Sequence, residues 1–103
     1  MSEFASIEQL WRVHVSRPFP RALAGEEIEG QDLVLLDSSA AGCISTFVGG
    51  CGAHSLDAGR LRVLGDCVQS LARISSQLPH EHRVYFDTLR EISERVLRFC
   101  RSD

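Results

Sequence analysis

The stretch from Gln31 to Val48 constrains the fold more than any other part of this chain, because it is the most apolar segment of the sequence. Apolar residues recur there at alternating steps of three and four, the spacing of one face of a helix. They are Leu33, Leu36, Ala40, Cys43 and Phe47. Other apolar residues widen this stripe almost all round the helix, so we expect the helix to lie in the middle of the fold. Asp32 can cap its N-terminus, and Gly49 and Gly50 can take the left-handed conformation that ends a helix.

Two features of this segment have more than one interpretation. Residues Leu33 to Leu36 can instead form a short buried strand, with the helix starting at Asp37, because periodicity does not separate a short strand from a helical turn. Gly42, in the middle of the helix, costs about 1 kcal/mol relative to Ala. Either another helix or a large aromatic such as Trp11 or Phe86 packs against it, or it opens a notch for a small ligand.

Three further segments have the periodicity of amphipathic helices. They run from Ser2 to about Ser16, from Asp57 to Leu78 and from His80 to about Cys100. The short link between the last two makes them antiparallel neighbours. The sequence therefore predicts an all-α fold: a small antiparallel four-helix bundle with one long irregular loop, in a single helical domain of residues 1–103.

The long loop, from Arg17 to Gln31, has its charges segregated, with the basic residues first and the acidic ones after them. A solvated loop of mixed charge explains this pattern, and so does a surface that recognises a charged protein partner. The candidate partner-binding residues are Arg17, Arg21, Glu26, Glu27 and Glu29. We expect the apolar side chains of the loop to pack back onto the bundle; they are Phe19, Leu23 and Ile28.

A second candidate site combines Gly42 with the glycine-rich loop that follows the apolar helix. Cys51 lies among glycines with His54 three residues on, which suggests a reactive thiol beside a base, or half of a metal site. Zinc would need two more ligands, and no second CxxC or HxxxH pair exists, so no metal or cofactor is expected. His14 shares the apolar face of the first helix, where a lone histidine is more typically a core or rim residue with one satisfied nitrogen than a catalyst.

Charge and composition exclude several classes of function. A net charge of −3 gives no general attraction to phosphate backbones or anionic lipid, so we expect no nucleic-acid and no membrane binding. The longest aliphatic run, Leu33 to Leu36, is far too short to cross a bilayer, and the N-terminus is not a basic, apolar signal. We expect a cytoplasmic protein whose four cysteines are thiols. All 11 basic residues are Arg, with no Lys and no Asn, which indicates a bacterium with a GC-rich genome.

The sequence contains no complete catalytic set, and this favours a non-enzymatic helical protein-interaction module, such as a regulator, an adaptor or an immunity-type partner. The alternative is a domain that binds a small ligand or catalyses a cysteine-dependent reaction with residues 42–55. Leftover apolar surface could also close a homodimer, which is compatible with either function.

Overall fold

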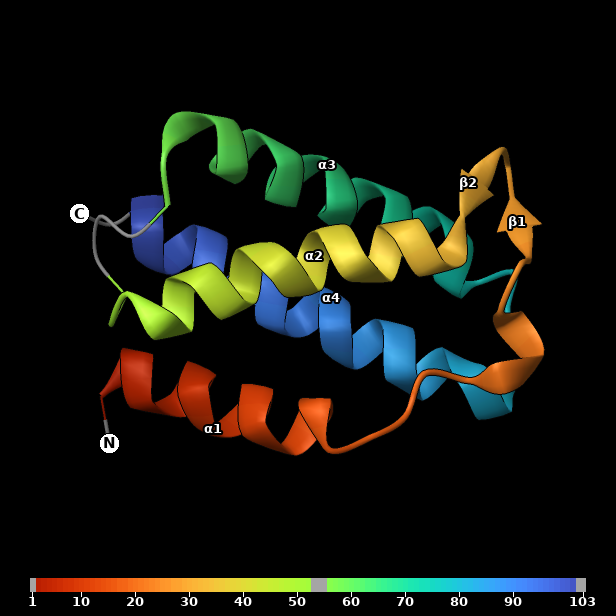
Figure 1. Ribbon diagram of the computed structural model, residues 1–103, viewed down its shortest axis with the longest axis horizontal. Coiled ribbons are helices and arrows are strands. Elements are labelled where there is room, and N and C mark those ends of the chain that lie inside the picture. Colours follow the sequence, from red (N-terminus) through yellow and green to blue (C-terminus); the bar gives the residue numbers. More distant parts are fainter. Residues whose placement is uncertain (1, 53–55, 102–103) are drawn as a thin grey trace.

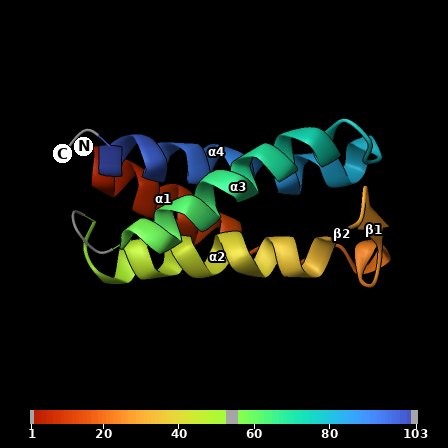
Figure 2. The same ribbon diagram turned by 90° about the horizontal axis from the view of Figure 1, so that it is seen from above.

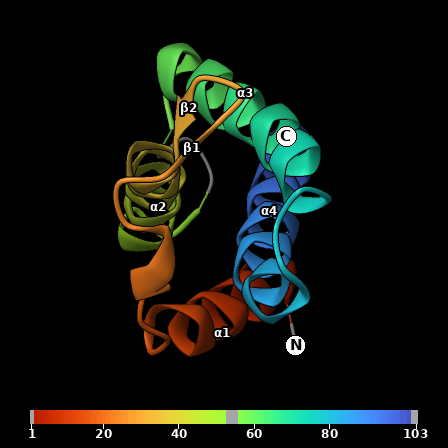
Figure 3. The same cartoon turned by 90° about the vertical axis from the view of Figure 1, so that its right-hand side faces the viewer.

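The structure, a computed structural model, describes residues 2–52 and 56–101. Its α-helices are α1 (Glu3–Val15), α2 (Leu33–Gly49), α3 (Ala58–Ser75) and α4 (His80–Arg101). Successive helices run in opposite directions (Figure 1), and seen from one end they surround a shared core (Figure 3). The predicted all-α antiparallel bundle is confirmed.

Three of the helices begin at a capping side chain, one of which is the predicted cap Asp32. Ser2, Asp32 and Asp57 each accept a hydrogen bond from the backbone N–H three residues on, at 2.8–3.0 Å. Such a bond satisfies one of the free N–H groups of the first turn. Because Asp32 caps α2, residues 33–36 form its first turn. The alternative interpretation of those residues as a strand was wrong.

The end of α2 lies further along the chain than predicted. Gly49 is still helical and Gly50 has φ −90°, so neither takes the left-handed conformation expected of it. Cys51 and Gly52 do, with φ of 59° and 97°. Their N–H groups donate to carbonyl oxygens of the last turn at 3.1 and 2.9 Å, the pattern of a Schellman motif. Cys51 therefore occupies the position at which glycine is the usual residue.

The loop between α1 and α2 contains a small hairpin that the sequence did not predict. Strands β1 (Glu27–Ile28) and β2 (Gln31–Asp32) pair antiparallel. Glu29 and Gly30 join them with φ of 53° and 78°, as in a type I′ turn. A 3₁₀ turn, Arg21–Leu23, precedes the hairpin. The apolar side chains of the loop pack on the core as predicted; they are Phe19, Leu23 and Ile28.

The helices do not share the core equally. α4 packs against each of the other three and most extensively against α3, whereas α1 rests mainly on α4. Viewed from above, α2 lies on the opposite side of the bundle from α4 (Figure 2). One face of α2 is open to solvent, so the prediction that this helix is innermost was wrong. The residues on its open face are mostly small. Small residues occur both on covered and on exposed helix faces, so the periodicity of the sequence did not show that this face is exposed.

Candidate functional site

The outer face of α2 differs in composition from the rest of the surface. We define this outer face by the exposed residues of the helix. They are Val34, Leu35, Ser38, Ser39, Gly42, Ser45, Thr46 and Gly49. None of them is charged, in a protein of which 24% of residues are charged. Asp37 is the one charged residue of α2, and its carboxylate accepts a hydrogen bond from the Tyr85 hydroxyl at 2.6 Å.

A groove of about 170 Å³ separates the outer face of α2 from α3, and we call it the α2–α3 groove. Its lining residues are Gln31, Leu35, Leu36, Ser39, Val63, Asp66, Cys67 and Ser70. Leu35 on one wall is 64% exposed and Val63 on the other is 44% exposed. Asp66 has no ion pair or hydrogen bond within the described part of the chain. The groove thus combines two exposed apolar side chains with one unpaired carboxylate.

Two thiols, Cys67 in the groove and Cys43 beside α3, have raised pKa values. Burial raises the pKa of Cys67 to about 11, and the carboxylate of Asp66 adds to that shift. Burial also raises the pKa of Cys43, whose sulfur lies 3.6 Å from the Arg60 carbonyl oxygen. Both side chains remain protonated at neutral pH, and a protonated thiol is a poor nucleophile and a poor metal ligand.

A second unusual cluster lies at the C-terminal end of α1. The His14 side chain is 2% exposed, and neither ring nitrogen has a hydrogen-bond partner among the described residues. Its ring packs against Tyr85 with centroids 4.6 Å apart and against Trp11 at 5.8 Å. Burial lowers the pKa of His14; the nearby Asp37 carboxylate opposes this shift, and Arg17 reinforces it. The histidine was predicted to be a core residue, but not to lack partners on both nitrogens.

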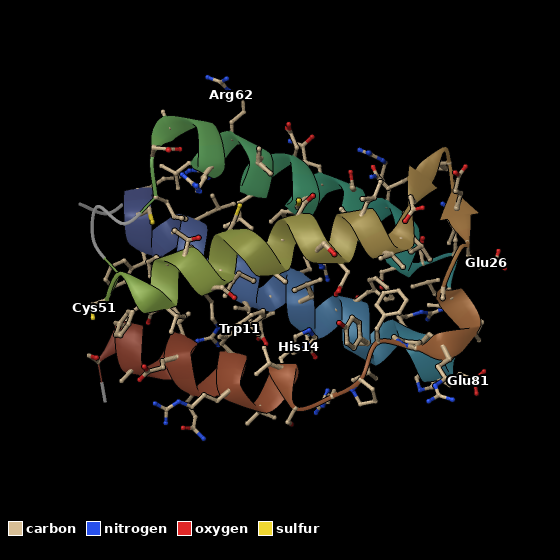
Figure 4. All side chains as sticks on the ribbon, viewed as in Figure 1. Trp11, His14, Glu26, Cys51, Arg62 and Glu81 are labelled. Atoms are coloured by element: carbon tan, nitrogen blue, oxygen red, sulfur yellow. The ribbon has the colours of Figure 1, made fainter. Side chains whose placement is uncertain are left out.

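Of the ligand-binding residues predicted from sequence, the structure describes Gly42 and Cys51, and neither lines the α2–α3 groove. Gly42 is exposed, and a Cβ added there would meet nothing within 4 Å. The close crossing by Trp11 or Phe86 was therefore wrong. Cys51 is exposed at one end of the bundle (Figure 4). His54 lies outside the described residues, so the pairing of Cys51 with His54 stays a prediction.

The five predicted partner-binding residues are all exposed. Arg17 and Arg21 precede the hairpin, and Glu26, Glu27 and Glu29 lie on it or beside it. Glu29 accepts a hydrogen bond from the Gln77 amide at the end of α3. Figure 4 places Glu26 and Cys51 at opposite ends of the bundle, so the two sites predicted from sequence are separate.

A larger depression of about 460 Å³ runs along α4 alone. Its charges alternate in sign and pair along the helix, with Arg90 and Arg95 at 3.7 Å from Glu94 and Glu91. Such i,i+4 pairs are typical of a solvated helix face. The lining of this depression therefore carries no net charge and is mostly polar.

No group of three or more His, Cys, Asp or Glu side chains is placed to hold a metal ion within residues 2–52 and 56–101. In the same ranges, each helix is too short or too polar to cross a membrane. No family model matches this chain, and no curated protein or solved structure matches it either.

Proposed function

We propose that this protein is a small, non-enzymatic helical interaction module that binds another protein through the outer face of α2 and the α2–α3 groove. The observation that carries the proposal is the absence of charge from all eight outer-face residues. The centres of protein interfaces are depleted of charged residues and surrounded by a polar rim. A helix of 17 residues also offers a face about 25 Å long, which suits packing against a partner.

Side-chain size supports the same surface. Ser38, Gly42 and Ser45 follow one another at steps of four and three along the outer face. Small side chains at this spacing allow the backbone of a partner to approach α2 closely. The exposed charges of the hairpin, including Glu27, lie beside the N-terminus of α2 and would form part of the rim.

A non-enzymatic role in the cytoplasm fits the thiols. Cys43 and Cys67 are thiols whose raised pKa values do not suit a nucleophile. Buried thiols of this kind persist in a reducing compartment. The backbone N–H of Cys51 belongs to the Schellman motif that ends α2, and its free thiol is exposed.

Site-specific photo-crosslinking in the native cell tests the proposal. A photoreactive amino acid replaces Leu35 on the outer face, and in a control protein it replaces Glu91 on the opposite side of the bundle. We expect a discrete adduct from position 35 that is absent at position 91. The same adducts from both positions, or none from position 35, would reject the outer face of α2. An adduct of the chain with itself would identify a homodimer.

A further inference from the structure

We propose that the α2–α3 groove receives an amphipathic helical segment of the partner, whose apolar side chains contact Leu35 and Val63 and whose Lys or Arg side chain binds Asp66. This inference rests on the proposed function and names the chemistry of the partner. It uses one observation that an interaction face alone would not supply: an unpaired carboxylate among the lining residues of the groove.

The apolar part of the proposal comes from the two walls. Leu35 belongs to the first turn of α2 and Val63 to the second turn of α3, so each helix contributes one exposed apolar side chain. Between them the lining includes Ser39 and Ser70, which are small. A third helix laid over two others at the usual interaxial distance of about 8–10 Å presents side chains at steps of three and four to both.

The charged part comes from Asp66. It lies one turn from Val63 and one turn from Ser70 on α3, and it is exposed. Arg73, one turn after Ser70 on α3, donates to the Ser70 hydroxyl at 3.3 Å. Arg62, one turn before Asp66, projects outward from α3 and away from α2 (Figure 4). A long basic side chain from a partner can lay its apolar stem along the groove and place its charged end at Asp66.

The surrounding charges favour a cationic partner over a second copy of this chain. From Ala22 to Gly49 the sequence contains five acidic residues and no Arg or Lys. This range includes the hairpin and all of α2. A second copy of this chain would bring to Asp66 a hairpin and an α2 that carry acidic residues and no basic one, and like charges in an interface disfavour association.

The test uses two fluorescent peptides of about 18 residues with leucines at helical spacing. One carries Lys at every polar position and the other carries Glu. Binding is measured by fluorescence anisotropy, and its location by shifts of the Val63, Asp66 and Ser70 amide resonances. We expect the Lys peptide to bind the intact protein more tightly than the Glu peptide and to shift these resonances.

Three variants separate the contributions. Asp66→Asn should weaken the Lys peptide about threefold to fivefold, the effect of losing an exposed ion pair. Glu3→Gln removes the same charge from α1 and should leave its affinity unchanged. Leu35→Gln should weaken both peptides, because it removes the apolar contact that they share.

The proposal is overturned if the two peptides bind equally, if neither binds, or if Glu3→Gln and Asp66→Asn have the same effect. It is also overturned by a dimer in light scattering that Leu35→Gln dissociates. Any of these results together with a crosslinked partner protein at position 35 would leave the interaction function in place and reject only the cationic helix. Absence of both crosslinking and peptide binding would reject the two together.

Discussion

The outer face of α2 and the buried histidine beside α4 depart from ordinary burial in opposite directions. The first leaves Val34 and Leu35 exposed on a helix face that carries no charged residue, and the second removes both nitrogens of His14 from water without a partner among the described residues. An exposed apolar side chain costs the folded state little, because apolar atoms make up much of any protein surface. An unsatisfied buried polar group costs about 1–3 kcal/mol. The exposed apolar residues of α2 therefore have little effect on the free energy of unfolding of the isolated protein, whereas the unpaired nitrogens of His14 lower it.

The two faces of α2 give the largest expected difference. Ile44→Ala, on the buried face, should lower the free energy of unfolding by about 2–5 kcal/mol, because it removes apolar contacts and leaves a cavity. Leu35→Ala, on the outer face, should change it by less than about 0.5 kcal/mol. Urea denaturation of both variants measures the difference. Equal losses would contradict the comparison and show that the outer face is covered in solution.

The next effect concerns His14 and pH. Its folded pKa is lowered, so below the usual value of 6.5 the unfolded chain binds a proton that the folded chain does not. Stability should therefore fall as the pH drops from 6.5 towards the folded pKa, by at most about 1.4 kcal/mol per pH unit. The residues around the His14 ring are left unchanged in the variants used for this test. They are Tyr85, Asp37 and Arg17.

The variant His14→Leu should remove this part of the pH dependence. The measurement is urea denaturation of both proteins at about pH 7.5 and about pH 5.5, on either side of the usual histidine pKa. The control is His80→Leu, which replaces an exposed histidine. If the pH dependence of stability survives in His14→Leu and disappears in His80→Leu, it comes from His80, and the prediction for His14 is wrong.

The smallest expected effect is a gain. Gly42→Ala adds a Cβ that meets nothing within 4 Å, so it should raise the free energy of unfolding by about 0.5–1 kcal/mol through helix propensity alone. Gly52→Ala is the matched contrast, because its Cβ would lie 3.0 Å from the Phe4 ring at a φ of +97°. Thermal unfolding checks both. A loss on Gly42→Ala would mean that another backbone already packs against the outer face.

The sequence predicted the helices well where a strong local signal stood at their ends. Asp32 and Asp57 cap α2 and α3, and Pro79 separates α3 from α4, because capping and the loss of a backbone donor act within one turn of the chain. The hairpin lacked such a signal. Its type I′ turn is Glu29-Gly30, whereas the usual signature is Asn-Gly or Asp-Gly, and this chain contains no Asn.

The candidate site depended on contacts between distant parts of the chain. Nothing local shows that Asp37 accepts a hydrogen bond from Tyr85, 48 residues away, which leaves α2 without an exposed charge. Ser39 and Gly42 are small enough for a covered or an open helix face, so periodicity placed α2 in the middle of the fold when one face is exposed. His14 was recognised as a buried residue from its apolar neighbours, but whether its nitrogens find partners depends on α4.

The packing of α1 on α4 also has a consequence for synthesis of the protein. α1 ends at Val15 and α4 begins at His80, so α1 is synthesised well before the helix on which it mainly packs. At about 5–20 residues per second, the ribosome needs several seconds to make the chain between them. During that time Ile7 and Trp11, buried in the finished fold, lack their main packing surface. A helix of 13 residues is only marginally stable alone, so α1 cannot complete its packing until α4 has emerged from the ribosome.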